Sequence, residues 1–338
     1  MKVLFVCSGN SQFYKVAPFI KSQGDSLEDE GIDLTYFLVE GKGLWNYLKN
    51  AGRLRKFLKQ HEYNFDIIHA HYSLCGWVAV LAFPEIPIVL SLMGDDAVGS
   101  FKRKGKITLK SRVMKLFVWT IQPFVKAIIS KSPNLERVVY RKKISYLIPN
   151  GIDLEKFKFH DNGWRDELGL QRNKKYVLFL ANPEDRNKNF ALARDAVKIL
   201  NRPDVELINV YNAPHKEVVK YLNAVNVFVL CSFSEGSPNV VKEAMTCGCP
   251  LVATNVGDVS WVTGDTPGCY ISSYDVNEFS QHINKAIEFS DLYGRTEGRE
   301  RILELGLDTK KIAHKIISIY NIVSGNQKKV KDYTNSFS

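Results

Sequence analysis

The sequence contains no apolar run long enough to cross a membrane. Its most apolar stretch, residues 77–93, is interrupted by Pro84, Glu85 and Pro87, whereas a transmembrane helix needs about 20 consecutive apolar residues. The first apolar run, residues 3–7, is too short for the core of a signal peptide and predicts a buried strand. We therefore expect a cytoplasmic protein whose contact with a membrane is at most peripheral, at its inner face.

Cysteine is scarce and lacks the spacing of metal and redox motifs. The six Cys residues are dispersed over 338 residues, and Cys247 and Cys249 are separated by one residue instead of two. This pattern is typical of reduced, buried thiols in a large cytosolic chain. Cys7 lies where a small tyrosine phosphatase would hold its nucleophile, but Phe13 replaces the arginine that such a loop needs. That activity is excluded.

Acidic residues in the first half are too few to balance the basic ones. Residues 1–160 carry 24 Lys and Arg against 14 Asp and Glu, whereas residues 161–338 carry 22 of each. A basic field attracts nucleic acid, anionic lipid or a phosphate-bearing substrate, and a merely well-solvated surface would look the same. The basic cluster from Lys102 to Lys115 contains no recognised nucleic-acid-reading motif, so we expect no nucleic-acid partner.

Short apolar runs alternate with amphipathic stretches along the whole chain, which is typical of parallel sheets covered by helices. The expected strands are residues 3–7, 34–39, 67–70, 88–92, 127–130, 146–148, 176–180, 205–210, 227–231, 250–254 and 269–271. The expected helices include residues 44–61, 74–82 and 109–124. The pattern restarts after residue 175 and predicts an α/β protein with two doubly wound, Rossmann-like domains.

A candidate hinge separates the two predicted domains at residues 149–153, Pro-Asn-Gly-Ile-Asp, because Pro ends a strand and Asn-Gly favours a turn with positive φ. We expect domains over residues 1–155 and 156–325, with the last helix packing back on the first domain. Residues 326–338 are predicted to be a flexible tail. A cleft between the domains should face the carboxyl ends of both sheets, where such folds bind ligands.

The sharpest local pattern is the segment 234–245, SEGSPNVVKEAM, which follows a predicted strand. Ser237 can cap a helix and Pro238 suits the first helical position. Free amides at that helix start would form a site for a diphosphate, and Glu235 and Glu243 could accept hydrogen bonds from hydroxyl groups. A capped helix that carries a structural acidic pair explains the spacing equally well.

Several motifs in order along the chain resemble the family-four retaining glycosyltransferases of GT-B fold, also called glycosyl transferases group 1. They are residues 68–72 (IHAHY), 150–153 (NGID), 185–190 (DRNKNF), 221–227 (YLNAVNV), 235–243, 249–254 (CPLVAT) and 256–259 (VGDV). The resemblance covers nearly the whole chain. It implies two Rossmann-like domains facing across a cleft, the first binding an acceptor and the second a nucleotide diphosphate sugar.

The resemblance also implies roles for single residues of the donor domain. Glu243 would hold the ribose hydroxyls and Glu235 those of the transferred sugar, while Lys188 and Arg186 would stabilise the departing diphosphate. The phosphate grip would be completed by backbone amides of Ser237, Asn239 and Val240. Asn209 and Tyr211, together with Asn212, follow a donor-domain strand and are candidates for the base pocket.

In the first domain the resemblance points to His71 as the histidine near the sugar. One of the two imidazoles of His69 and His71 should point into the cleft, and His69 is expected in the core. Gly9 and Asn10 occupy the place of the glycine loop near the donor phosphates, with one Gly where the family often has two.

The chain departs from the family pattern at two further places. The acceptor-side segment that contains Met93 and Asp96 has Met93 where the family usually has a histidine. At Ala181-Asn182 the family often has Gly-Arg, and Arg186 could take over that role. Asp-x-Asp, with which metal-dependent GT-A enzymes hold a divalent ion, is absent from the sequence. We expect no metal and no other cofactor, and retention of configuration follows from the resemblance alone.

One alternative function and one interaction surface remain open. A non-hydrolysing nucleotide-sugar epimerase shares the architecture but needs no acceptor. The basic amphipathic stretches 44–61 and 101–119 lie in the acceptor half, and such helices can lie in an anionic membrane interface. This would suit a glycan or lipid-linked acceptor made for a bacterial surface polysaccharide. An apolar stripe that packs on the sheet below a solvated basic face is the structural alternative.

Overall fold

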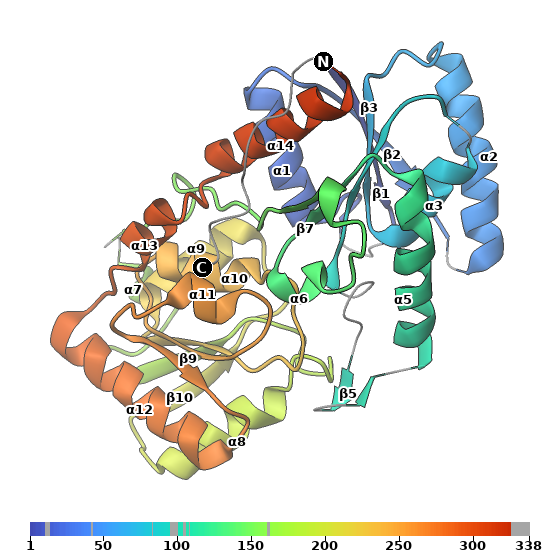
Figure 1. The fold of residues 1–338 in the computed structure, drawn as a ribbon. Coiled ribbons are helices and arrows are strands. Elements are labelled where there is room, and N and C mark those ends of the chain that lie inside the picture. Colours follow the sequence, from blue (N-terminus) through green and yellow to red (C-terminus); the bar gives the residue numbers. More distant parts are fainter. Residues whose placement is uncertain are drawn as a thin grey trace. The chain divides into compact units, whose positions relative to one another are not determined.

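The computed structural model describes residues 1–10, 14–41, 43–82, 84–94, 101–103, 106–107, 109–160 and 163–325. The chain divides into two compact units (Figure 1). The first unit consists of Met1–Ser100, Thr108–Gly151 and the chain from Thr309, and the second of Phe101–Ile107 and Ile152–Asp308. Apart from the short segment Phe101–Ile107, the chain thus enters the second unit within the predicted hinge segment and returns to the first before α14 (Thr309–Val323).

The first unit is built on a six-stranded parallel sheet with the order β2-β1-β3-β4-β7-β8. Its strands are β1 (Lys2–Ser8), β2 (Asp33–Val39), β3 (Ile67–His71), β4 (Ile88–Ser91), β7 (Ala127–Ser130) and β8 (Ser145–Leu147). β3 and β4 are buried along their whole length. Continuous apolar runs form these strands because helices cover both faces of the sheet.

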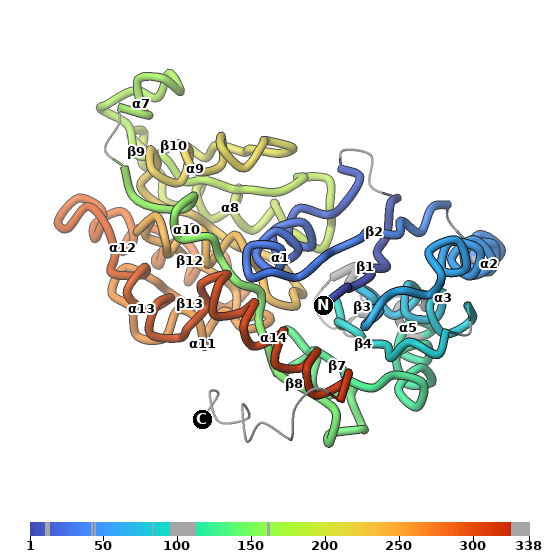
Figure 2. Tube along the Cα trace, turned by 90° about the horizontal axis from the view of Figure 1, so that it is seen from above, coloured from blue at the N-terminus to red at the C-terminus, as the bar shows by residue number. Residues whose placement is uncertain are grey.

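Helices cover the two faces of this sheet in two groups. They are α1 (Pro18–Asp29), α2 (Leu44–Gln60), α3 (Ser73–Leu81), α5 (Leu109–Ile121), α6 (Pro133–Glu136) and α14 (Thr309–Val323), with short 3-10 turns at Gln122–Phe124 and Lys142–Ile144. α2, α3 and α5 bury Leu54, Val78 and Val118 in one cluster with Leu4 of β1. α1 and α14 lie side by side (Figures 1 and 2).

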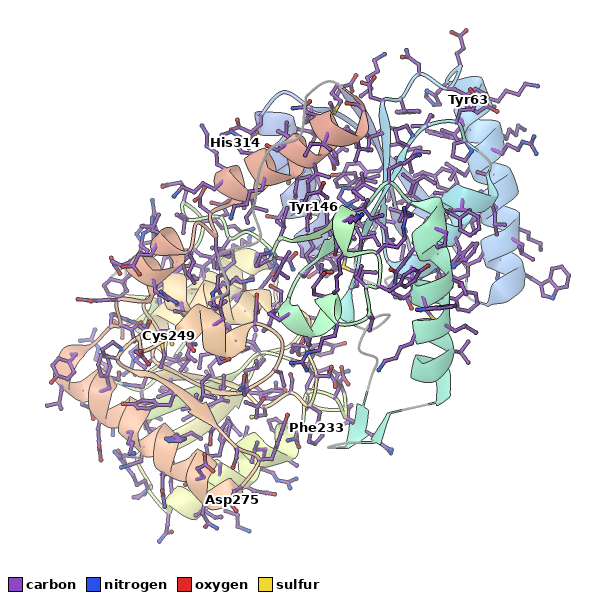
Figure 3. The ribbon with its side chains drawn as sticks, in the orientation of Figure 1. Tyr63, Tyr146, Phe233, Cys249, Asp275 and His314 are labelled. Atoms are coloured by element: carbon purple, nitrogen blue, oxygen red, sulfur yellow. The ribbon has the colours of Figure 1, made fainter. Side chains whose placement is uncertain are left out.

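The C-terminal helix α14 is fixed to the first unit by its buried face and by its outer edge. Ile312, Ile316 and Tyr320 are buried in it. On its exposed side, His314 Nε2 lies 2.6 Å from Glu30 Oε2, immediately after α1 (Figure 3). Residues from the far end of the sequence therefore complete the fold of the first unit.

The second unit contains a five-stranded parallel sheet with the order β10-β9-β11-β12-β13. Its strands are β9 (Lys175–Phe179), β10 (Val205–Asn209), β11 (Val227–Leu230), β12 (Leu251–Thr254) and β13 (Cys269–Ser272). Its helices are α7 (Trp164–Glu167), α8 (Phe190–Leu200), α9 (His215–Ala224), α10 (Asn239–Thr246), α11 (Val259–Thr263), α12 (Val276–Tyr293) and α13 (Gly298–Glu304).

The long helix α12 illustrates how sequence sets a helix start in this unit. Asp275 precedes it, and its carboxylate accepts a hydrogen bond of 2.9 Å from the backbone amide of Glu278 (Figure 3). This is the contact that makes Asp a favoured N-cap. Phe279 and Ile283 of α12 then pack with Leu192 and Ala196 of α8 in one apolar cluster below the sheet.

Each strand expected from the sequence is present, within one or two residues of the expected bounds. Two parallel sheets with alternating helices confirm the prediction of two Rossmann-like domains. The segment 101–107 differs from the expectation of a basic amphipathic stretch, because it forms the short antiparallel strands β5 (Phe101–Arg103) and β6 (Lys106–Ile107).

The predicted turn with positive φ at the hinge was wrong. Neither Asn150 nor Gly151 has a positive φ. Gly151 is needed for close approach instead: a Cβ on this residue would lie 2.9 Å from Cα of Thr309 and 3.2 Å from Cβ of Ile312. The return of the chain as α14 explains why a residue without a side chain stands here.

Candidate active site

Two loops at the carboxyl ends of β9 and β11 bring a cation and a carboxylate together. Lys188, in the loop after β9, places its Nζ 2.6 Å from Oε1 of Glu235, in the loop after β11. The side chains are 31% and 15% exposed, so the pair is shielded but open to a ligand. The sequence predicted both residues for the donor site, but not that they contact each other.

Backbone and amide hydrogen bonds hold these two loops in register. Asp185 accepts from the amide of Asn187 at 2.9 Å, which shapes the turn before Lys188. Asn187 Nδ2 donates to the carbonyl of Ser234 at 2.8 Å, and the amide of Phe233 donates to the carbonyl of Asn187 at 2.8 Å. The position of Lys188 relative to Glu235 is therefore set by the fold and not by the ion pair alone.

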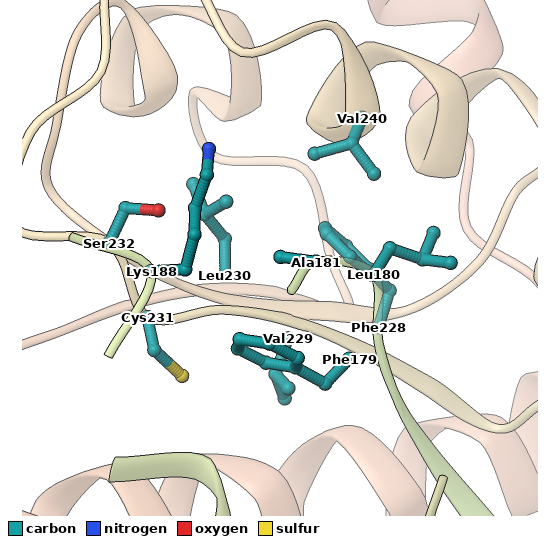
Figure 4. Close-up of a pocket in the computed structure, with 10 residues that line it drawn as sticks. All are labelled: Phe179, Leu180, Ala181, Lys188, Phe228, Val229, Leu230, Cys231, Ser232 and Val240. Atoms are coloured by element: carbon teal, nitrogen blue, oxygen red, sulfur yellow. The ribbon is translucent and has the colours of Figure 1, made fainter. Parts of the chain in front are cut away.

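A small pocket opens beside this pair (Figure 4). It is lined by the ends of β9 and β11, by Lys188 and by Val240 of α10. Lys188 rises on the same side of the strands as Val240, whereas Cys231 points to the opposite side (Figure 4). Open α/β sheets bind their ligands at this carboxyl edge.

The start of α10 differs from the prediction. The helix begins at Asn239 and Pro238 is its N-cap, without a side-chain capping bond. Ser237 does not cap: its hydroxyl donates to Oδ2 of Asp258 at 2.6 Å. The first amides of an α-helix have no acceptor within the helix, so those of Asn239 and Val240 remain suited to an anion.

In the loops of Lys188 and Glu235 and at the start of α10, three buried polar atoms have no hydrogen-bond partner within the described part of the chain. They are Asn187 Oδ1, Ser232 Oγ and Asn239 Oδ1. Native proteins leave few buried polar atoms unsatisfied, because each one costs free energy. Their gathering beside the Lys188–Glu235 pair is what a binding site for a polar ligand requires.

Glu243 lies in the interior of α10 and is 6% exposed. Burial raises the pKa of its carboxyl group to about 7, although the nearby Lys156 and Lys242 act in the opposite direction. Burial disfavours the charged form of an acid. Its protonation therefore changes close to neutral pH, and small changes in its surroundings decide its charge.

A buried group that the sequence did not reveal lies directly behind the loop of Glu235. Lys242 Nζ is 3.2 Å from Oδ2 of Asp258, and each side chain is 1% exposed. Burial lowers the pKa of Lys242, while Asp258 opposes this shift. The available signal was a lysine inside the 234–245 motif next to Glu243, together with the Asp of the segment VGDV.

The remaining predicted donor residues take three different positions. Arg186 is exposed and forms no ion pair with any described residue, so its guanidinium is available to a ligand. Asn209 donates from Nδ2 to the carbonyls of Phe179 and Ala181, at 3.2 and 2.9 Å, which gives its amide a structural role. Tyr211 is 47% exposed. Their part in a base pocket stays a prediction.

In the first unit, the two histidines of β3 lie on the same face of the sheet. Their rings stack with centroids 4.2 Å apart, and both side chains are buried. The expectation that one points away from the other was wrong, because residues two apart on a strand share a face. Burial and the nearby Lys131 hold the pKa of His71 well below its usual value, so the ring is neutral at physiological pH.

His69 and His71 nevertheless differ in their partners. His69 is a hydrogen-bonded core residue, as expected: its Nδ1 lies 2.6 Å from the Tyr320 hydroxyl and its Nε2 lies 2.8 Å from Oγ of Ser91. Neither ring nitrogen of His71 has a hydrogen-bond partner among residues that the structure describes. His71 is therefore the histidine with free hydrogen-bonding capacity.

The loop after β1 is held by its own side chain. Asn10 Nδ2 donates to the carbonyl of Gly41 at 3.1 Å, and its Oδ1 accepts from the amide of Gly41 at 2.7 Å. A Cβ on Gly9 would lie 3.1 Å from Cβ of Leu38. On the acceptor side, Met93 follows β4, whereas Asp96 lies outside the described residues.

Neither a metal cluster nor a membrane span is found in the described ranges. They contain no group of three or more His, Cys, Asp and Glu residues that could hold a metal ion. No helix among them is both long and apolar enough to cross a bilayer. None of the six cysteines forms a disulfide with a described residue, and burial raises the pKa of those at 7, 231, 247, 249 and 269.

Comparison with models of known protein families identifies the family of this chain. Residues 12–156 match the model of Glycosyltransferase Family 4, and residues 194–288 match that of Glycosyl transferases group 1. The chain belongs to the family-four glycosyltransferases. The matched ranges include the β3 histidines in one unit and the 234–245 motif in the other.

Two curated glycosyltransferases are each 27% identical to this family-four chain. One is the putative teichuronic acid biosynthesis glycosyltransferase TuaC of Bacillus subtilis, aligned over 68% of this chain and 64% of the relative. The other is the UDP-Gal:alpha-D-GlcNAc-diphosphoundecaprenol alpha-1,3-galactosyltransferase of Escherichia coli, aligned over 84% and 78%. The chain thus spans less than two thirds of the length of TuaC.

Solved structures of other proteins show the same GT-B fold. The sucrose-phosphate synthase of Thermosynechococcus elongatus superposes with a TM-score of 0.77 at 17% identity, covering 96% of this chain and 99% of that one. Anabaena HepE in complex with UDP superposes with a TM-score of 0.70 at 16% identity, over 94% and 98%. At this identity the likeness concerns the fold alone.

Proposed function

We propose that the protein transfers a sugar from a nucleotide diphosphate sugar to a glycan or lipid-linked acceptor, with retention of configuration, in the synthesis of a bacterial surface polysaccharide. The observation that carries this proposal is the Lys188–Glu235 pair, 2.6 Å apart, at the carboxyl edge of the second sheet. A cation for a diphosphate and a carboxylate for sugar hydroxyls are the two groups that such a donor needs side by side.

Stabilising the leaving diphosphate is the main chemical task, because negative charge develops on it as the sugar departs. Lys188 supplies a point charge, the exposed Arg186 can supply a two-pronged contact, and the amide end of α10 adds a helix dipole. We propose that these groups act without a metal ion. A transfer rate that is unchanged by a chelator would support this, and a rate restored only by a divalent ion would overturn it.

In this proposal the two glutamates bind different parts of the nucleotide sugar. Glu235 accepts hydrogen bonds from hydroxyls of the transferred sugar, and Glu243 accepts them from the ribose. Glu243 is buried, and burial raises the pKa of its carboxyl group to about 7. Bound ribose hydroxyls would give this carboxyl group hydrogen-bond donors. Asn187 Oδ1 and Asn239 Oδ1 have no hydrogen-bond partner among the described residues and are further acceptors for hydroxyl groups of the nucleotide sugar.

In the first unit we propose His71 as the residue that contacts the sugar. Its neutral ring offers one donor and one acceptor nitrogen, and neither is used by another described residue. The ring of His69 stacks on that of His71 and supports its position. A neutral imidazole suits hydrogen bonding to a hydroxyl better than electrostatic stabilisation of an anion.

We propose that the protein works at the cytoplasmic face of the membrane, where it meets a lipid-linked acceptor through an exposed apolar patch. The patch consists of Val113, Leu116, Trp119, Phe124 and Tyr140, each between 47% and 59% exposed. The Trp119 and Tyr140 rings lie 5.5 Å apart. Exposed basic residues are near it in the sequence, at Lys126, Arg137 and Lys143. Aromatic and basic side chains together favour an anionic lipid interface.

The other predicted membrane element, α2, fits the structural alternative better. Its apolar stripe packs on the sheet, with Leu54 and Leu58 fully buried. Trp45 and Leu48 near its start remain 78% and 42% exposed. The membrane proposal therefore rests on α5 and the turn that follows it.

The proposed transfer is tested with the purified full chain and a panel of nucleotide sugars. A nucleotide sugar that binds the native state should raise the melting temperature. The same nucleotide sugar should then give a labelled, extended product with an undecaprenyl-diphosphate sugar in vesicles. Formation of an isomerised nucleotide sugar without acceptor would instead identify an epimerase. Binding of no nucleotide sugar would overturn the proposal.

A further inference from the structure

A buried ion pair with a shared hydroxyl lies behind the proposed diphosphate loop. Lys242 Nζ is 3.2 Å from Asp258 Oδ2, and the same oxygen accepts the Ser237 hydroxyl at 2.6 Å. The hydroxyl oxygen in turn accepts a hydrogen bond from Lys242. All three residues are at least nine-tenths buried. The Ser237 hydroxyl is thus committed to the protein and does not serve the phosphates.

The three residues come from three different segments of the second unit. Ser237 lies in the loop after β11, Lys242 in α10, and Asp258 in the loop after β12, immediately before α11. The two loops also touch through their backbones. Gly257 has a φ of +63°, and a Cβ on it would lie 2.4 Å from the carbonyl oxygen of Gly236. The network therefore ties the loop of Glu235 to its neighbour at one defined place.

Stability alone gives a weak reason for such a pair. Taking two charges out of water is costly, and well-packed apolar residues of similar volume often replace a buried pair without loss of stability. What a buried pair does provide is one preferred arrangement of the segments that it joins. Here those segments include Glu235 and the amides of Asn239 and Val240, the proposed donor contacts.

We propose that Lys242 and Asp258 act through Ser237 as positioning residues, which hold the loop 234–238 in the shape that binds the donor diphosphate. This inference rests on the proposed function. The network touches neither sugar nor phosphate. It fixes where Glu235 meets Lys188 and where the first amides of α10 point.

The test removes both charges at once, so that neither is left buried without a partner. The variant Lys242→Met with Asp258→Leu should keep the melting temperature within a few degrees of the unmodified protein. Its affinity for a nucleoside diphosphate should fall by about tenfold to a hundredfold, since small displacements of binding groups have effects of this size. The KM for the acceptor should stay unchanged, because the acceptor does not depend on this loop.

A matched control is available in the same unit. Lys175, at the start of β9, forms an ion pair with Asp291 of α12, and both side chains are partly exposed. This pair lies at the amino end of its strand, away from the loop of Glu235. Lys175→Met with Asp291→Leu should leave nucleotide affinity within twofold. A larger loss in the Lys242 and Asp258 variant would then be due to the position of that pair and not to the loss of a Lys–Asp pair as such.

Single changes at Ser237 keep the inference testable if the double variant does not fold. Ser237→Ala leaves the two charges in direct contact but removes their link to the loop, and should weaken nucleotide binding. Ser237→Thr retains a hydroxyl and should restore most of the affinity. A merely structural role would lower the melting temperature in both variants without this pattern of rescue.

The outcomes separate this inference from the proposed function. If the unmodified protein binds no nucleoside diphosphate or nucleotide sugar by calorimetry, the proposed function fails. If it binds them, and Ser237→Ala and the folded double variant keep affinities within twofold, the positioning role is wrong. Loss of affinity in these variants, with the Lys175 and Asp291 control unchanged, supports it.

Discussion

Lys188 Nζ lies 2.6 Å from Oε1 of Glu235, so the proposed diphosphate cation and the proposed sugar carboxylate are each other's partners. A diphosphate that takes Lys188 must compete with this carboxylate for the ammonium group. The exchange is possible because the pair is partly exposed and a second cation, Arg186, stands in the same loop without an ion-pair partner in the described chain. In the proposed site, binding of the donor diphosphate to Lys188 would therefore release Glu235 toward the sugar.

Replacing Lys188 with Met should lower kcat by about 10²-fold to 10³-fold, because one electrostatic contact to the developing charge is lost. The fold should persist, since the loop is held by Asn187 and Asp185 through their own hydrogen bonds. Initial rates at saturating donor measure the effect. Lys198→Met, an exposed lysine of α8, is the matched control. A rate within threefold of the unmodified protein would rule out this role for Lys188.

Glu235→Gln should separate binding of the nucleotide from binding of its sugar. The change frees Lys188 from its carboxylate partner, so a nucleoside diphosphate should bind at least as tightly as before. The matching nucleotide sugar should lose affinity and rate, because an amide replaces the stronger acceptor for sugar hydroxyls. Calorimetry with both ligands gives the comparison. Equal losses for both ligands would show that Glu235 contacts the nucleotide instead.

Glu243 should make the stability of the protein depend on pH. Burial raises the pKa of its carboxyl group from 4.5 to about 7. The folded state thus binds more protons than the unfolded state between these values, and the free energy of unfolding falls as pH rises through this window, by about 3 kcal/mol. Glu243→Gln should remove this decline, which denaturant unfolding at pH 5 and pH 8 would reveal.

The same carboxyl predicts proton release on donor binding. If ribose hydroxyls donate to Glu243, they favour its charged form and lower its pKa in the complex. Calorimetric titrations near pH 6.5, in two buffers of different ionisation enthalpy, should then show release of a fraction of a proton, and Glu243→Gln should show none. Proton uptake by the unmodified protein would contradict the proposed contact.

The two histidines of β3 should respond in opposite ways to removal. His69→Ala leaves the Tyr320 hydroxyl and Ser91 Oγ buried without this partner, and each such group costs about 1–3 kcal/mol of stability. His71→Ala breaks no hydrogen bond to a described residue, so it should lower the transfer rate more than the melting temperature. The reverse pattern would assign the sugar contact to His69.

Vesicle binding tests the apolar patch of α5. Trp119→Ser with Phe124→Ser should weaken flotation with anionic vesicles at low salt, because two exposed aromatic side chains are removed. Leu292→Ser with Tyr293→Ser, at even more exposed positions of α12, should bind like the unmodified protein. Binding should fade as salt is raised. An unmodified protein that stays unbound at low salt would leave a soluble acceptor as the better proposal.

Much of the fold could be predicted because its central strands are buried on both faces. An apolar run such as residues 227–231 has few alternatives to a central parallel strand, and β11 is found there. The prediction of the helix start near Pro238 was less accurate. Ser237 has the side chain of a good cap, but a buried aspartate 21 residues later in the chain takes its hydroxyl. Local propensity could not reveal this competing partner.

The residues of the candidate site were proposed from the sequence, but their contacts with one another were not. The approach of Lys188 to Glu235 joins residues 47 positions apart, and that of His69 to Tyr320 joins residues 251 positions apart. Such pairs depend on how strands are ordered in a sheet, which a single sequence does not record. The stacking of His69 on His71 was predictable, however, since alternate residues of a strand share a face.

The place of α14 has a consequence for how the protein is made. Tyr320 fills the core of the first unit and bonds to His69, yet it is synthesised after the whole of the second unit. Until α14 has left the ribosome, a growing chain must therefore leave uncovered the surface of the first unit that packs against Ile312, Ile316 and Tyr320. The second unit, whose residues 152–308 are continuous, can reach its native state first.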